Sequence, residues 1–201
     1  MPLGDRRLGV QPLTADNANY EQTLARAGLR GGEPLVVLHS PRAGATDGWP
    51  VANFTQIAIR LVNNFGVRIV VADEPYDGGF SKALAAAGLP QGAITLAEPR
   101  AVEFAAALAR ASVFVTDEPH AAKMAVELGA PALEIADIAT RPRRSNPPAG
   151  GDSTRQRSAR AHRIARGSSR VRVSADVVFE LAVEMLQESR TPSLIQHFGD
   201  S

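Results

Sequence analysis

The apolar residues of this chain fall into short runs that alternate with segments of helical period. Five runs rich in valine, isoleucine and leucine predict strands, at residues 34–39, 67–72, 93–97, 112–116 and 131–135. Such alternation is the pattern of a parallel sheet with helices on its faces. The sequence therefore predicts an α/β fold with a Rossmann-like, doubly wound parallel sheet.

The segments between and after the strands carry apolar residues at every third or fourth position. They predict helices at residues 51–65, 79–87, 99–110, 120–128 and 175–188, and a short helix within 19–29. Gly28 and Gly66 suit helix ends, Pro50 suits a first helical turn, and Ser174 is a candidate cap for the last helix.

Composition divides the chain into five segments. We expect a linker with a short helix (1–33), a Rossmann-like domain (34–140), a basic flexible loop (141–172), a helix packed on the domain (173–189) and a tail (190–201). The loop prediction rests on two adjacent prolines, a double glycine and many serines and arginines.

The composition also excludes several classes of protein and site. With 201 residues, 44% of them hydrophobic, the chain can bury one sizeable core. It has no cysteine, which excludes disulfides and thiolate sites, and its four histidines lack metal-ligand spacing, so we expect no metal and no cofactor. Because no apolar run has membrane length and the start lacks an apolar signal segment, we expect a cytoplasmic location.

Positive charge is concentrated in one segment. Ten arginines and one acid lie between Arg141 and Arg172, a local charge of +9, so that the remainder carries −8 within a total of +1. Such a segment can neutralise phosphates, but no aromatic residue lies between Val115 and Val178 to stack on bases, which disfavours nucleic acid. A nucleotide diphosphate, an acidic partner or an anionic membrane surface is the favoured contact.

Three loops at the predicted carboxyl ends of strands are candidates for ligand binding. They span residues 39–50, 72–79 and 116–123. In a parallel sheet such loops lead into helix amino termini, whose free N–H groups attract anions. Arg42 and Thr46 in the first loop are available to a phosphate, whereas no P-loop or GxGxxG sequence occurs.

The adjacent acids Asp117 and Glu118 have two compatible interpretations. Asp117 suits the N-cap of the following helix, and the same carboxylate can contact a sugar. For His120 and Lys123, a solvated helix face is favoured over a ligand contact. For His39 and Trp49, we favour packing, with the histidine hydrogen-bonded at its strand end and the indole buried beside the helix that follows.

Several motifs resemble glycosyltransferase family 9, the heptosyltransferases of lipopolysaccharide core synthesis. In order they are LHSPRAGAT, WP before a helix, an acidic loop after a strand, AVEFAAALARAS, VTDEP and LGAP. The family commonly shows HPGAS, KxWP, GGPxE, VTNDTGPMH and LAAALGTP in this order. The resemblance covers about residues 34–135.

The resemblance implies one half of a GT-B architecture, in which two Rossmann-like domains face each other across a cleft and the carboxyl-terminal one holds a nucleotide sugar. Gly44, Ala45 and Thr46 would approach the diphosphate, and Asp77 would meet the ribose. The full set of implied substrate-binding residues is Arg42, Gly44, Ala45, Thr46, Asp77, Asp117, Glu118, His120 and Lys123. Family members typically use a catalytic carboxylate from the amino-terminal domain and no metal, so we expect the catalytic base to lie outside this chain.

The chain departs from the family pattern at several positions. The lysine of KxWP is absent, and Asp73 with Glu74 replaces the paired glycines of GGPxE. Glu118 stands where the family has aspartate, and Pro119 with His120 begins the stretch that replaces TGPMH. The residues that form the strands and helices thus match the family pattern better than the residues that would contact the substrate.

Two principal hypotheses follow. The first is the donor-binding half of a heptosyltransferase-like enzyme, which binds a nucleotide-diphosphate sugar for transfer to a glycan or lipopolysaccharide-core acceptor and is inactive without an amino-terminal domain. The second is a non-catalytic interaction module with a GT-B-derived fold that pairs with a separate amino-terminal half. In either case the basic segment at 141–172 can contact the inner membrane surface, which would place the protein peripherally on it.

Overall fold

The structure is a computed structural model that describes most of the predicted elements. The described residues are Gln22, Ala25, Arg26, Gly28, Leu29, 32–41, 48–73, 79–89, 93–96, 101–136, 162–166 and 173–190. All structural statements below refer to this part of the chain.

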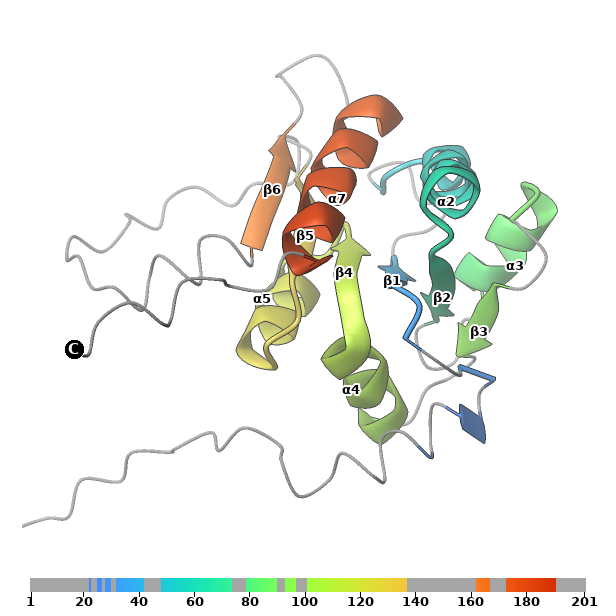
Figure 1. The fold of residues 1–201 in the computed structure, drawn as a ribbon. Coiled ribbons are helices and arrows are strands. Elements are labelled where there is room, and N and C mark those ends of the chain that lie inside the picture. Colours follow the sequence, from blue (N-terminus) through green and yellow to red (C-terminus); the bar gives the residue numbers. More distant parts are fainter. Residues whose placement is uncertain are drawn as a thin grey trace, which may run out of the picture.

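The described strands form one six-stranded parallel sheet with the order β3-β2-β1-β4-β5-β6 (Figure 1). Their bounds are Leu35–His39 (β1), Arg68–Ala72 (β2), Ile94–Leu96 (β3), Ala111–Thr116 (β4), Ala132–Ala136 (β5) and His162–Arg166 (β6). Five of them match the predicted strands to within one or two residues. The predicted α/β fold with a parallel sheet is therefore confirmed.

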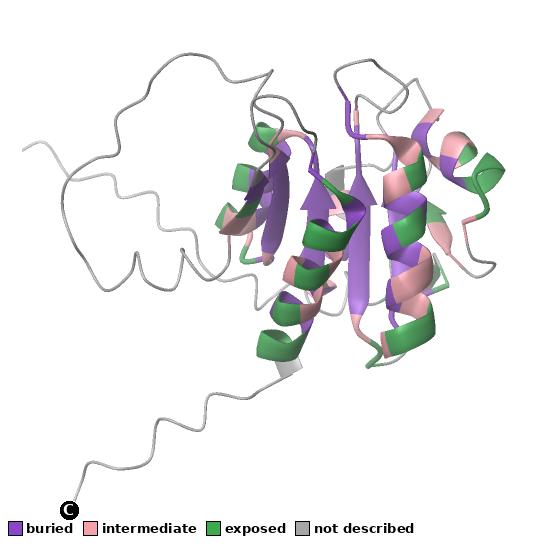
Figure 2. Ribbon diagram, turned by 90° about the horizontal axis from the view of Figure 1, so that it is seen from above, coloured by how far each residue is buried: buried purple, intermediate pink, exposed green. Residues whose placement is uncertain are grey.

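Helices cover both faces of this sheet, as the doubly wound pattern predicts. Their bounds are Val51–Phe65 (α2), Gly79–Ala86 (α3), Ala101–Arg110 (α4), Pro119–Glu127 (α5) and Ala175–Arg190 (α7). α2, α3 and α7 pack on one face, and α4 and α5 on the other (Figure 1). Figure 2 shows the buried strands in purple between helices whose outward sides are exposed. None of the described helices is both long and apolar enough to cross a membrane.

The core has two layers because alternate residues of each strand face opposite sides of the sheet. On the side of α2 and α7, Phe54 is fully buried and contacts Trp49 edge-on at 4.6 Å and Phe80 at 5.0 Å between ring centroids. On the other side, Phe114 packs beneath α4 beside Phe104. Trp49 is only 2% exposed, which confirms the packing interpretation of this residue.

Strand β6 is the main difference from the sequence prediction. The composition of residues 141–172 predicts a flexible basic loop, which is wrong for residues 162–166 because they pair with β5 in parallel register. Arg163 explains part of their order, since its guanidinium contacts Glu184 and Glu188 on α7. The basic segment thus contributes a strand to the edge of the sheet.

Helix α7 follows β6 and packs against α2 and the sheet. The guanidinium of Arg60 on α2 lies 2.6 Å from Asp176 and 3.8 Å from the ring centroid of Phe179, both on α7. The predicted cap is present, because the hydroxyl of Ser174 accepts a hydrogen bond from the N–H of Val177 at 3.4 Å. α7 is therefore held along the face that carries α2.

The predicted helix near the amino terminus is described only in part. Gln22, Ala25 and Arg26 are helical. Gly28 has a φ of +84° and its N–H bonds to the carbonyl of Ala25 at 3.0 Å, so the helix ends where the sequence predicts.

Candidate functional site

The sheet topology brings the starts of three loops to one edge. Because all paired strands are parallel, their carboxyl ends lie together, and the residues that follow β1, β2 and β4 are Ser40, Asp73 and Asp117. The three side chains are buried, with exposures of 3%, 3% and 2%. β1 is followed by a helix on one face, whereas its neighbour β4 is preceded and followed by helices on the other, so the topological switch point lies between β1 and β4. Open α/β sheets bind ligands at such a point.

The carboxylate of Asp117 joins three separate segments. Its Oδ2 accepts a hydrogen bond from the hydroxyl of Ser40 at 3.0 Å and another from the backbone N–H of Trp49 at 3.1 Å. Ser40 follows β1, and Trp49 stands just before α2. Asp117 therefore contacts one residue near each end of the first candidate loop.

The helix-cap role belongs to Glu118, not to Asp117. The side chain of Glu118 accepts a hydrogen bond from the N–H of His120 at 3.1 Å, and Pro119 occupies the first position of α5. The N-cap prediction for Asp117 is thus wrong by one residue. The cap needs only a short-range acceptor, which Glu118 supplies.

Thr116 and His39 form a buried pair at the same edge. The Thr116 hydroxyl is 3.0 Å from Nδ1 of His39 and also accepts the backbone N–H of Glu118 at 3.1 Å. His39 is 5% exposed and its ring lies 5.8 Å from Phe104 and 5.9 Å from Phe114. The prediction of a packed, hydrogen-bonded histidine is confirmed.

The carboxylate of Asp73 accepts hydrogen bonds from the start of α3. One of its oxygens accepts the backbone N–H of Ser81 at 2.8 Å and the other accepts the Ser81 hydroxyl. The negative charge of Asp73 is therefore turned toward the first turn of a helix, where carboxylates are stabilised.

The predicted site residues divide into two groups. Those on α5 and at its start lie together: Glu118 is half-buried, while His120 and Lys123 are exposed, as a solvated helix face requires. Lys123 is 3.8 Å from Glu127 one turn along, a weak exposed ion pair. The other predicted residues, Arg42, Gly44, Ala45, Thr46 and Asp77, lie outside the described residues.

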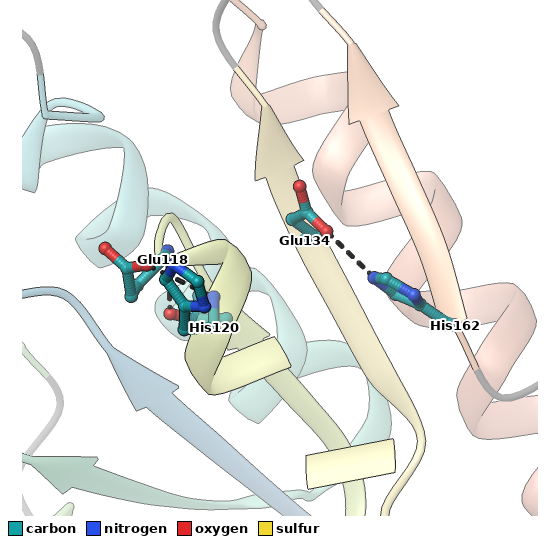
Figure 3. A network of polar contacts seen from close by, with 5 residues as sticks. Glu118, His120, Glu134 and His162 are labelled. Carbon is teal, nitrogen blue, oxygen red and sulfur yellow. Dashed lines mark hydrogen bonds and ion pairs between the residues drawn. The ribbon is translucent and has the colours of Figure 1, made fainter. Parts of the chain in front are cut away.

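Sequence reasoning missed two polar residues at this edge. Ser40 could have been noticed because it directly follows a buried strand. Glu134, on β5, is 8% exposed and its Oε2 is 2.9 Å from Nε2 of His162 on β6 (Figure 3). It is the register partner of Thr116, which is itself the partner of His39, so a polar row crosses β1, β4 and β5. Figure 3 also shows Glu118 and His120 at the start of α5.

The described residues include no group of three or more histidine, aspartate or glutamate side chains that could hold a metal ion. The carboxyl ends of β1, β2 and β4 instead present hydrogen-bond donors and acceptors close to helix amino termini. Such an arrangement suits an organic anion, provided that cations are supplied nearby.

Comparison with known proteins identifies the fold. No protein-family model and no curated protein sequence matches the chain. Among solved structures, ADP-heptose LPS heptosyltransferase II of E. coli matches 87% of this chain and 53% of its own length, with 17% identity and a TM-score of 0.64. A glycosyltransferase of family 9 from Veillonella parvula matches 86% of this chain and 51% of its own length, with 15% identity and a TM-score of 0.66.

This chain has the fold of one half of a GT-B glycosyltransferase. It spans about half the length of these two structures. The UDP-GlcNAc 2-epimerase of Neisseria meningitidis, in a structure bound to UDP-GlcNAc, matches 87% of this chain and 41% of its own length, with 10% identity and a TM-score of 0.55. The fold is thus common to proteins named for different reactions.

Proposed function

We propose that this chain is the donor-binding half of a sugar-nucleotide glycosyltransferase of the heptosyltransferase type. It binds a nucleotide-diphosphate sugar for transfer to a glycan or lipopolysaccharide-core acceptor. The observation that carries the proposal is the convergence of Ser40 and Asp117 at the switch point of a parallel sheet, with Asp73 at the same edge, where helix amino termini can receive a diphosphate. The names of the similar structures, which include ADP-heptose and UDP-GlcNAc, support this ligand class.

In this proposal the first loop binds the diphosphate and the start of α5 faces the sugar. A cation is needed because three buried acids, Asp73, Asp117 and Glu134, already stand at this edge. Arg42 is the cation nearest in sequence to Ser40 and can form paired hydrogen bonds with phosphate oxygens. The proposed contacts are Arg42, Gly44, Ala45 and Thr46 with the diphosphate, Asp77 with the ribose, and Asp117, Glu118, His120 and Lys123 around the sugar.

The proposal includes a second half that supplies the acceptor site and the catalytic carboxylate. The similar glycosyltransferases are about twice as long as the matched region. We further propose that the protein works in the cytoplasm and approaches the inner membrane through the arginines of residues 141–172.

Binding of a donor is expected to stabilise the fold. A nucleotide sugar present at 100 times its dissociation constant should add about 2.7 kcal/mol to the free energy of unfolding. Thermal unfolding with UDP-GlcNAc and with ADP-heptose measures this, and adenosine and uridine serve as controls that lack the diphosphate. If no nucleotide diphosphate at millimolar concentration moves the transition, the donor-binding proposal fails and the interaction-module hypothesis takes its place.

Arg42→Ala is expected to weaken binding of ADP or UDP by about 10-fold to 100-fold, because a charge-assisted hydrogen bond contributes about 1.5–3 kcal/mol. Titration calorimetry on the purified protein measures the change. Arg68→Ala is the matched control, since it removes the same charge at the opposite edge, where Arg68 begins β2 and its guanidinium lies 3.8 Å from the carboxylate of Glu33. Equal affinities for the two variants would contradict the placement of the diphosphate.

A further inference from the structure

We propose that β6 is an edge strand that opens by itself, because charged contacts on both faces hold it on the sheet and little buried apolar surface does. Within the described part of the chain, β6 pairs with β5 alone. High ionic strength, or the loss of one charged contact, releases β6 while the other strands stay paired. This conformational device does not depend on the proposed function.

β6 buries far less apolar surface than a central strand. All five residues of β1 are buried. Among the β6 residues whose burial is described, only Ala165 is buried, at 1% exposure, and Ile164 is 36% exposed. An alanine methyl group contributes much less hydrophobic stabilisation than the valine and leucine side chains of β1. The backbone bonds to β5 and the charged side chains therefore supply most of the attachment.

The first charged contact lies on the face that carries α7. Arg163 is the register partner of Leu133, whose side chain belongs to the core on that face, so Arg163 extends toward α7. Its two terminal nitrogens donate separately to Glu184 and Glu188, which are one helical turn apart. Both carboxylates are exposed, so dissolved salt can screen this contact.

The second charged contact lies on the opposite face, where His162 meets β5. Its Nε2 is 2.9 Å from Oε2 of Glu134, and the carboxylate oxygen accepts this hydrogen bond (Figure 3). Glu134 is buried, so salt screens this contact less than that of Arg163. β6 is thus attached through one charged group on each face of the sheet.

The helices on either side of β6 have attachments of their own. α7 is seated by buried apolar side chains and by the contact of Arg60 with Asp176 at 2.6 Å, and α5 by three buried alanines. These side chains are Val178, Ala182, Met185 and Leu186 on α7, and Ala121, Ala122 and Ala125 on α5. They stay in place when Arg163 and His162 lose their partners. Opening of β6 is therefore local, and it uncovers the outer backbone edge of β5.

Amide hydrogen exchange of the wild-type protein tests the inference without any substitution. The amides of β6 that bond to β5 should exchange at least about 100-fold faster than the paired amides of β1. Raising sodium chloride from about 0.1 to about 1 M should speed β6 at least about threefold and leave β1 unchanged or slower. Equal protection of β6 and β1, or the same salt response in both, would overturn the inference.

Arg163→Met removes the guanidinium and keeps the apolar stem. It should speed exchange in β6 by about tenfold and leave β1 unchanged, because charge-assisted bonds to two carboxylates are lost. Arg60→Met is the matched control, since it removes another arginine that pairs with α7, and it should change β6 by less than about twofold. Equal effects of the two variants on β6, or acceleration spread over all strands, would contradict the proposal.

A double-mutant cycle isolates the contact between Arg163 and α7. The variant E184Q/E188Q should speed β6 as much as R163M does, and adding R163M to it should change exchange by less than about twofold. Glu134→Ala removes the contact on the other face and should speed β6 by about tenfold. A full effect of R163M in the E184Q/E188Q background, or an unchanged β6 in E134A, would show that these charges do not hold the strand.

Discussion

Phe54→Ala is expected to lower the free energy of unfolding by about 3–5 kcal/mol, the usual range for a large aromatic ring removed from a core. The ring is fully buried and lies between Trp49 and Phe80, with centroid distances of 4.6 and 5.0 Å. Its loss leaves a cavity beside Trp49, which lies near the end of the first loop. We therefore expect weaker nucleotide binding as well as lower stability.

Urea unfolding followed by circular dichroism measures the stability change without depending on the environment of the single tryptophan. Phe65→Ala is the matched control, because Phe65 lies on the last turn of the same helix and is only half-buried. It should cost about 2 kcal/mol or less. Similar losses for the two variants would show that α2 is not seated on the sheet through Phe54.

Thr116→Val is expected to cost about 2–4 kcal/mol although the two side chains have nearly the same shape. The hydroxyl is fully buried and serves two groups, Nδ1 of His39 and the backbone N–H of Glu118. Valine cannot accept the bond from Glu118 or pair with the ring nitrogen. Each buried group that loses its partner costs about 1–3 kcal/mol.

Thr55→Val separates this hydrogen-bond effect from the change in side chain. Thr55 is also buried, but among the described residues its hydroxyl donates to the Val51 carbonyl in the same helix, at 3.1 Å, where the backbone bond remains. Its replacement should cost less than about 1 kcal/mol. If both valine variants unfold at the same urea concentration, the hydrogen bonds of the Thr116 hydroxyl to His39 and Glu118 do not stabilise the fold.

The fold was largely readable from the sequence because β1, β2 and β4 are continuous apolar runs and the intervening helices have clear apolar stripes. Strand β6 was not readable. Its sequence, HRIAR, has only two apolar residues and lies in an arginine-rich segment. An edge strand pairs on one side only, so a continuous apolar pattern is not required of it.

The site was readable only in outline. Parallel strands place their carboxyl ends together, so the shared edge follows from the strand pattern alone. The partners of Asp117 could not be predicted, because Ser40 and Trp49 are distant in sequence and the local pattern fits a helix cap equally well. Glu134 was missed for a similar reason, since its partner His162 lies on β6, which the sequence pattern did not predict.

The central claim is that the edge formed by the carboxyl ends of β1 and β4 binds a nucleotide diphosphate. Titration of isotope-labelled protein with ADP and with UDP, followed by amide NMR, tests it most directly. The account predicts saturable shifts at Ser40, at both N–H groups of Trp49 and at Glu118, with little change at Arg68 on the opposite edge. Shifts confined to the opposite edge, or none at millimolar nucleotide, would contradict it.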